Sequence, residues 1–457
     1  MDELSEIRKR VKRVFELRFI DLKPDALTYL ANYLKGRSLE DMKEFSGKLV
    51  DKLIEKKVDD RPIDLEILKT CLKKDADKKI VFEVVDVENW NSEASAGDIQ
   101  KFSSFDALRA RFANIKSRVE ATNLVSIELL YSRTNVVVTV LGMFFQEKNG
   151  KYCIEDDTGC LKLKIGTVEF GDGVFFEGGI YEFRGLYNSG VLQLESVRIP
   201  RLKPEPRVSI DPNVWSKNDC IVVLSDVWLD TPAVLKMIYK ILDGFTHMSP
   251  YAFIFCGDFL SPENQHCSLS LSKKGFEHLS NVFRQFKEAY TNTQFIFVPS
   301  LHDFPESEVL PRDEVPFKEI YFSDFSNVQF TSNPAKIQCR DQTVVVCRDD
   351  IVESICRNAI KIPSETNQLV PAFCQTILSQ RHFSPLPIHI SPKLLHQDQC
   401  FQLCPLPDVL ILADRFQSFS FSNSDCTILN PGSFSRSDFE FFVYYTSSRV
   451  AEASSCT

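Results

Sequence analysis

Three patterns of hydrophobic residues follow one another along this chain, and each pattern limits the fold to a different class. Over residues 1–75, apolar side chains recur at helical spacing, as at Ile7 and Val11. Over residues 125–200, they alternate with polar side chains, which indicates β-strands. Over residues 208–457, short apolar runs alternate with helical stretches, which is typical of an α/β layered domain. The sequence therefore predicts a multidomain α+β protein.

The first segment, residues 1–75, is predicted to be a small helical bundle. Pro24 begins a second helix and Gly36 ends it, and further helices are expected after Ser38 and after Pro62. The first 80 residues carry 20 Lys and Arg side chains against 17 Asp and Glu, whereas the whole chain has a net charge of −9. The basic face of this N-terminal domain is therefore either simply solvated or a docking surface for an acidic partner.

Residues 76–124 are predicted to be a linker that contains a short helix, and residues 125–200 an OB-type β-barrel. The barrel is expected because five strands fall within about 75 residues, and Asn188-Ser189-Gly190 is a strong hairpin signal. Residues 132–199 hold 7 basic and 9 acidic side chains, so the barrel attracts phosphate backbones only weakly. Its phenylalanines are expected in the core rather than stacked on bases: Phe144, Phe145, Phe175, Phe176 and Phe183.

The cysteines argue against a zinc finger and against secretion. None of the 14 cysteines forms a C-x-x-C pair, and the closest spacing is that of Cys400 and Cys404. Unpaired cysteines in this number are typical of the cytosol or the nucleus. No run of about 18 apolar residues occurs, so no membrane association is expected. We also expect no cofactor.

In the segment 208–457, which is predicted to be one domain, several buried runs end in a carboxylate or a histidine. The runs end before Asp226, Asp258, His302-Asp303 and Asp414. Because the carboxyl ends of parallel strands meet at one edge of a sheet, function tends to lie there in α/β domains.

The order of these residues resembles that of the calcineurin-like metallophosphoesterases, so an α/β sandwich of that type is expected. The family's motifs are D-x-H, G-D, G-N-H-D/E, a single His and G-H-x-H. Two metal ions about 3.5–4 Å apart bind the attacking and leaving oxygens of a phosphate ester. Asp226, Asp258 and His302 match the family's pattern, and His382 is the expected counterpart of the single histidine.

Four other positions depart from the family's pattern. Trp228, Leu301 and Phe416 stand where metal ligands are expected, and none of these side chains offers a lone pair to a metal. Asp414 replaces a histidine. The resemblance therefore implies no catalytic residue and no bound metal, but a set of vestigial positions: Asp226, Trp228, Asp258, Leu301, His302, His382, Asp414 and Phe416. Buried carboxylates without a metal need a cationic partner, and Arg415 is the candidate.

The order of domains along the whole chain resembles the B-subunit family of DNA polymerase epsilon. The stretches that carry this resemblance are Leu224–Asp230, Phe253–Phe259, Thr376–Pro387, Leu406–Asp414 and Asn430–Phe441. It implies a nuclear accessory subunit without enzymatic activity. The OB and phosphoesterase-like domains would bind the zinc-containing C-terminal region of the catalytic subunit, and contact with the small histone-fold subunits would be indirect. The N-terminal domain, similar to an AAA+ lid, would link the polymerase to the GINS-containing replicative helicase, and DNA would be met mainly within the complex.

Two alternative functions remain. One is a metal-dependent phosphoesterase or nuclease with a degenerate site, and the lost ligands argue against it. The other is a single-strand DNA-binding OB protein, and the acidic barrel argues against it. Neither objection applies to a scaffold, because a scaffold needs surface rather than a reactive centre.

Overall fold

The computed structural model describes residues 3–16, 22–33, 50, 63, 82–85, 104–147, 149–205, 219–265 and 269–456. The chain divides into two compact units, residues 1–81 and 82–457. In the first unit, helices α1 (Glu3–Glu16) and α2 (Pro24–Tyr33) contact each other. Val11 and Phe15 of α1 and Leu30 of α2 are buried, as their helical spacing predicts. The helices predicted after Ser38 and after Pro62 lie outside the described residues.

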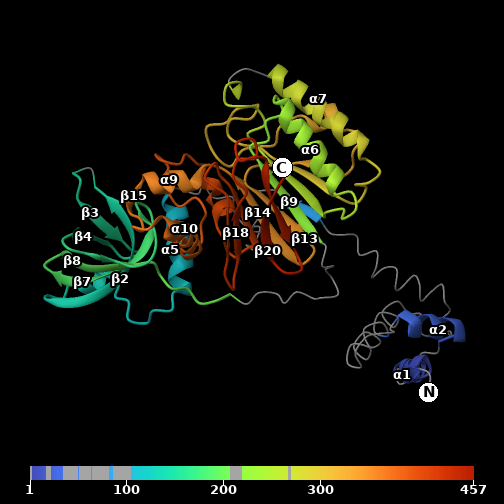
Figure 1. The fold of residues 1–457 in the computed structure, drawn as a ribbon. Coiled ribbons are helices and arrows are strands. Elements are labelled where there is room, and N and C mark those ends of the chain that lie inside the picture. Colours follow the sequence, from blue (N-terminus) through green and yellow to red (C-terminus); the bar gives the residue numbers. More distant parts are fainter. Residues whose placement is uncertain are drawn as a thin grey trace. The chain divides into compact units, whose positions relative to one another are not determined.

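The second unit contains a closed β-barrel (Figure 1). Its strands are β2 (Val136–Gln146), β3 (Tyr152–Glu155), β4 (Cys160–Lys164), β5 (Glu169–Phe170), β7 (Ile180–Asn188) and β8 (Val191–Arg198), with a 3-10 helix η2 (Ile127–Leu130) before them. They pair in the order β4-β3-β2-β7-β8-β5, and β4 also pairs with β8, which closes the barrel. Ser189 and Gly190 have φ of 50° and 82°, so the predicted hairpin turn is confirmed. Four of the five barrel phenylalanines are buried and Phe145 is half-buried.

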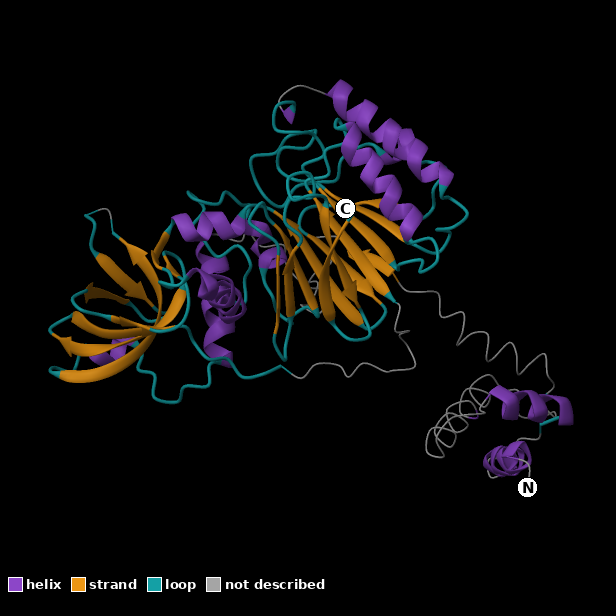
Figure 2. Cartoon of the chain, viewed as in Figure 1, coloured by secondary structure: helices purple, strands orange, loops and turns teal. Residues whose placement is uncertain are grey.

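Two six-stranded sheets pack against each other in the rest of this unit (Figure 2). The first sheet has the order β12-β11-β10-β9-β19-β20, and the second has the order β1-β13-β14-β16-β18-β17. The strands of the first sheet are β9 (Cys220–Ser225), β10 (Ala252–Cys256), β11 (Gln294–Val298), β12 (Val328–Phe330), β19 (Glu440–Tyr445) and β20 (Val450–Ser455). Those of the second sheet are β1 (Phe82–Val85), β13 (Ala335–Cys339), β14 (Gln342–Arg348), β16 (Val409–Ala413), β17 (Phe419–Ser422) and β18 (Thr427–Asn430). The predicted α/β layered domain is thus present.

Helices cover the two outer faces of this sandwich (Figure 2). They are α6 (Pro232–Gly244), α7 (Leu269–Gln285), α8 (Lys318–Tyr321), α9 (Ile351–Arg357), η4 (Thr366–Gln368), α10 (Leu369–Gln380) and η5 (Leu395–Phe401). Val234 and Ile238 of α6 and Phe276 of α7 bury their side chains against Phe253 and Phe255 of β10. On the other sheet, α9 and α10 form a second apolar core, to which the short strand β6 (Phe175–Phe176) adds Phe176.

The chain before the barrel holds more structure than the predicted linker. The short helix expected there is α5 (Ser104–Arg118). Strand β1 was not anticipated, and it pairs antiparallel with β13 at the edge of the second sheet. A run of four residues is too short to give a clear alternation pattern.

Barrel and sandwich are joined directly. The side-chain amide of Gln380 in α10 accepts a hydrogen bond from the backbone N–H of Ile180 and donates one to its carbonyl oxygen, both at 2.8 Å. The Thr376 hydroxyl accepts from the Val174 N–H at 2.9 Å. A short strand, β15 (Ala359–Lys361), pairs with β6, which precedes the barrel strand β7 in the chain. These contacts come from different parts of the sequence and fix the two folds as one unit.

Candidate functional site

Four strands, two from each sheet, end at the same place in the sandwich. Strands β9 and β10 are parallel with Ser225 opposite Cys256, so Asp226 and Asp258 follow at neighbouring strand ends. Strands β14 and β16 are also parallel, and the last residue of β14, Arg348, lies opposite Ala413. This convergence brings carboxylates of one sheet to the guanidinium of the other.

Arg348 is the centre of this cluster and is 2% exposed. Its Nη2 donates to Asp226 Oδ1 at 2.7 Å and lies 3.6 Å from Asp258 Oδ2. Its Nη1 donates to Asp350 Oδ1 at 3.1 Å. One buried guanidinium therefore contacts three carboxylates.

The same guanidinium also bonds to the backbone of both sheets. Nε donates to the carbonyl oxygen of Gly257, which follows β10. Nη1 donates to the carbonyl oxygen of Ala413, the last residue of β16, at 3.2 Å. Every nitrogen of the Arg348 guanidinium has a partner, which is the condition for burying such a group without a large desolvation penalty.

Arg415 adds a second cation, as the charge argument from the sequence predicted. Its Nη2 donates to Asp258 Oδ2, and its Nη1 lies 3.6 Å from Asp350 Oδ2. Its Nε is 4.0 Å from Asp226 Oδ2. Two guanidinium groups thus compensate the carboxylates that the resemblance assigns to metal binding.

His302 lies on the outer side of Asp258. Its ring Nδ1 is 3.1 Å from Asp258 Oδ1, and its side chain is half-exposed. The hydrogen bond to Asp258 raises the pKa of His302, although burial opposes the shift. Burial alone would raise the pKa of Asp258, but Arg348 and the His302 hydrogen bond outweigh it and hold that pKa well below its ordinary range.

Asp303 and Gly257 stabilise the backbone around Asp258. Asp303 accepts hydrogen bonds from the backbone N–H groups of Phe259 and Ser300, both at 2.7 Å. Burial, together with the neighbouring Asp258, raises the pKa of Asp303 to about 6. A Cβ on Gly257 would overlap the Asp303 carboxylate and would approach the Ser300 nitrogen to 2.7 Å. A glycine is therefore required here by close packing, whatever the chemistry of the site.

The remaining vestigial positions have structural contacts. The Trp228 ring lies under the Arg436 guanidinium, 5.3 Å from it. Leu301 and Phe416 pack against the core between the second sheet and its helices. Asp414 accepts from the N–H groups of Val352 and Phe416, both at 2.7 Å. Burial and the charge of Asp350 raise the pKa of Asp414 to about 7.

His382 does not join this cluster, and its expected place as the single histidine of the site is not supported. Its Nε2 is 3.1 Å from Asp398, and the Ser384 N–H donates to its Nδ1 at 3.1 Å. Burial lowers the pKa of His382 to about 3. The residue that does enter the cluster is Arg348, which the sequence analysis missed. It directly follows the apolar run Thr343–Cys347, but the residues sought at the ends of such runs were carboxylates and histidines.

The side chains of the cluster do not fit a two-metal centre. Two guanidinium groups already contact the two aspartates, and a divalent cation would be repelled by both. Trp228, Leu301 and Phe416 contribute no ligand atom. Within the described residues, no group of three or more His, Cys, Asp or Glu side chains is arranged to hold a metal ion. In the same part of the chain, no helix has the length and apolar character of a membrane span.

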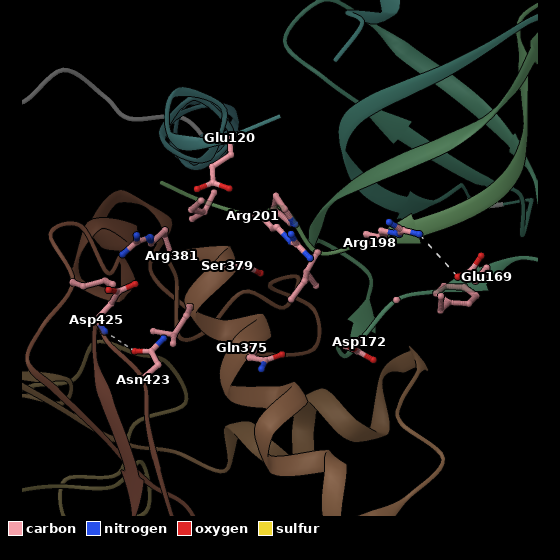
Figure 3. Close-up of a pocket in the computed structure, with 17 residues that line it drawn as sticks. Glu120, Glu169, Asp172, Arg198, Arg201, Gln375, Ser379, Arg381, Asn423 and Asp425 are labelled. Atoms are coloured by element: carbon pink, nitrogen blue, oxygen red, sulfur yellow. Dashed lines mark hydrogen bonds and ion pairs between the residues drawn. The ribbon is translucent and has the colours of Figure 1, made fainter. Parts of the chain in front are cut away.

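A cleft of about 700 Å³ lies between the barrel and the sandwich (Figure 3). Arg198 and Arg201 line it from the end of the barrel, and Ser379 and Arg381 line it from α10. Its acidic residues are Glu120, Glu169, Asp172 and Asp425. Arg381 is 4% exposed, and its Nε and Nη1 have no hydrogen-bond partner within the described ranges. The cleft is therefore polar, charged and built from both folds.

Comparison with known proteins assigns both folds to one family. The family of B subunits of DNA polymerases alpha and epsilon matches residues 221–421, and the family "DNA polymerase epsilon subunit 2-like, OB-fold domain" matches residues 99–201. A probable DNA polymerase epsilon subunit 2 of Caenorhabditis elegans is 30% identical over 99% of this chain and 95% of that protein. The DNA polymerase epsilon subunit 2 of Bos taurus is 31% identical over 72% of this chain and 68% of its own length.

A solved structure described as a novel archaeal phosphodiesterase is also similar, at 14% identity. It covers 51% of this chain and 98% of its own, with a TM-score of 0.29, and this score is too low to bear on the fold. The assignment of the family rests on the similar sequences instead, because one of them aligns over nearly the full length of the chain. The chain belongs to the DNA polymerase epsilon subunit 2 family, the B subunits of that polymerase.

Proposed function

We propose that this chain is a scaffold without catalytic activity, which binds the C-terminal zinc-containing region of the polymerase's catalytic subunit. The observation that carries the proposal is the alignment of 99% of the chain with an epsilon subunit 2. The Asp226–Arg348 cluster supports it, because guanidinium groups compensate the carboxylates where a phosphoesterase would need metals. A scaffold of this kind works in the nucleus and contacts the small histone-fold subunits only indirectly.

The cleft between barrel and sandwich is the surface we assign to the catalytic subunit. Both of its walls are fixed by the Gln380 and Thr376 contacts, so the partner meets a preformed surface. Arg201 lies in it and is exposed, and Figure 3 shows it between the barrel and α10. Charged groups in such a surface fix register and orientation.

Titration calorimetry with the C-terminal region of the catalytic subunit tests this assignment. Arg201→Glu should weaken binding about tenfold or more, because it places a carboxylate among the acidic residues of the cleft. Arg184→Glu is the matched control, because Arg184 is an exposed barrel arginine that does not line the cleft. Equal losses for both variants, or none for either, would show that the partner is held by another surface.

The absence of enzymatic activity is tested with Mn²⁺. The purified chain should hydrolyse neither a generic phosphodiester nor single-stranded DNA. Turnover that EDTA abolishes and that His302→Gln also removes would instead support the alternative, a metal-dependent phosphoesterase. Tight and strongly salt-dependent binding of single-stranded DNA by the full chain would support the second alternative, a single-strand-binding barrel.

The N-terminal domain, residues 1–75, is proposed as an AAA+ lid-like tether to the GINS-containing helicase. Two observations support this role: residues 1–81 form a compact unit of their own, and α1 exposes Lys9 and Arg13. In a pull-down with both partners, deleting residues 1–75 should release the helicase and should retain the catalytic subunit. Release of the catalytic subunit with the helicase retained would reverse the assignment. Contact with DNA is expected mainly within the complex.

A further inference from the structure

The carboxylate cluster holds its own cation, and that cation joins the two sheets. Arg348 belongs to the second sheet, whereas Asp226 and Gly257 follow strands of the first. The Arg348 side chain also donates a hydrogen bond within its own sheet, to the Ala413 carbonyl oxygen. Arg348, at the end of β14, therefore connects the ends of β9, β10 and β16 through the hydrogen bonds of one buried guanidinium.

We propose that Arg348 is a built-in cation that replaces the metal centre of this site and clamps the two sheets together, so that removing it turns the site into one that binds a divalent cation. The proposal concerns the fold of the chain and does not depend on which partner the chain binds. A lysine would not serve equally, because its ammonium is a point charge. It cannot reach the Gly257 and Ala413 carbonyl oxygens and the Asp226 carboxylate at the same time.

One carboxylate oxygen in the cluster remains available. Asp226 is 1% exposed, and its Oδ2 has no hydrogen-bond partner in the described residues. The nearest guanidinium nitrogen on that side, Arg415 Nε, is 4.0 Å away. Without Arg348, this oxygen and those of Asp258 and Asp350 would keep Arg415 as their guanidinium partner, so three carboxylates would face one guanidinium and the site would carry a net negative charge. Hard divalent cations prefer oxygen ligands of this kind.

The test compares thermal unfolding of the full chain with and without Mn²⁺. Arg348→Met, which keeps an unbranched apolar stem but removes the guanidinium, should lower Tm by about 10 °C. Millimolar Mn²⁺ should then raise the Tm of Arg348→Met by about 3 °C or more and should leave the wild type unchanged. A second substitution, Asp226→Asn, should raise the Tm of Arg348→Met in the absence of metal, because it removes part of the uncompensated charge.

Arg312→Met is the matched control. Arg312 is 5% exposed and donates to the carbonyl oxygens of Ser300 and Asp303 at 2.6 and 2.8 Å. Its loss should also lower Tm, but Mn²⁺ should not restore it, because in the described part of the chain Arg312 donates to backbone carbonyl oxygens and not to carboxylates.

The proposal is overturned if Mn²⁺ leaves the Tm of Arg348→Met unchanged, or if it shifts the wild type or Arg312→Met by as much. If Arg348→Met does not fold, Arg348→Lys provides the test. It should unfold below the wild type by several degrees and show no response to Mn²⁺, because a positive charge remains. If Arg348→Lys has the same Tm as the wild type, the planar guanidinium group is not what holds the two sheets together.

Discussion

Two buried polar clusters lie in the unit formed by residues 82–457, and they compensate charge in opposite ways. The first is the Asp226–Arg348 cluster at the strand ends, where guanidinium groups remain charged between carboxylates. The second lies where α5 packs against η5, and it contains Arg111, His382, Lys393 and Asp398. Here three basic side chains lie near one carboxylate, Asp398, and burial lowers the pKa values of His382 and Lys393.

The second cluster is less completely bonded than the first. Arg111 donates from Nη1 to the Pro385 carbonyl oxygen at 3.4 Å, while its Nε and Nη2 have no hydrogen-bond partner in the described part of the chain. Lys393 donates to the carbonyl oxygens of Ser384 and Leu386, and burial lowers its pKa to about 7. The guanidinium groups of the first cluster keep their charge over the ordinary pH range, whereas burial of His382 and Lys393 favours their neutral forms.

The largest effect is expected in the first cluster. Asp258→Ala removes one of the carboxylates that Arg348 and Arg415 share and should cost about 3–5 kcal/mol of unfolding free energy. Urea denaturation measures it as a lower midpoint at constant m. The control is Asp157→Ala, which breaks the exposed ion pair with Lys116 and should cost about 0–1 kcal/mol. A cost for Asp258→Ala as small as that of the control would mean that the arginines find other partners.

A smaller effect, confined to acidic pH, is expected in the second cluster. The pKa of His382 is lowered to about 3 in the folded state, so its contribution to stability is complete above the unfolded value near 6.5 and is lost as the pH falls toward 3. Between pH 7.5 and pH 5 this loss amounts to about 2 kcal/mol. His382→Gln should remove that part of the pH dependence, because its amide can still accept from Ser384 N–H and donate to Asp398.

Denaturation of both proteins at pH 7.5 and pH 5 measures the difference directly. Wild type and His382→Gln should have similar stability at pH 7.5, and the variant should lose less on acidification. Parallel losses in the two proteins would show that His382 is protonated in the fold or that other groups carry the acid sensitivity.

The smallest effect is expected for Arg111→Met. Arg111 is 5% exposed and Arg348 is 2% exposed, so both are buried arginines. Arg111 makes one long hydrogen bond, and an apolar replacement for a poorly paired buried charge is often close to neutral. We therefore expect a change within about 1 kcal/mol in urea denaturation. A loss of unfolding free energy as large as that of Asp258→Ala would show that burial alone determines how much a buried arginine stabilises this fold, whatever its hydrogen bonds and ion pairs.

The sequence predicted what local patterns determine. The buried runs that became β9, β10, β11 and β16 were recognised, and so were the hairpin at Ser189-Gly190 and the pairing of Arg415 with a buried carboxylate. The pairing followed from charge alone, because an aspartate at a buried strand end needs a cation.

What the sequence did not predict depends on contacts between distant segments. Arg348 lies 122 residues from Asp226, and only the packing of the two sheets brings them together. His382 was assigned by its order along the chain, but it lies beyond the end of α10, beside Asp398, and not at the end of a strand. Strand β1 pairs with the edge of β13, and its four residues, although they include two valines and a phenylalanine, are too few to predict that pairing.

Strand β1 also determines how a mechanical load would enter this protein. The chain enters the second unit through Phe82–Val85, whose four residues pair with Lys336–Cys339 at the end of a sheet. Any force applied through the preceding residues is therefore borne first by this short ladder and not by the barrel that follows in sequence. Because an edge ladder of four residues can separate without disturbing the core, β1 would detach before the sandwich unfolds.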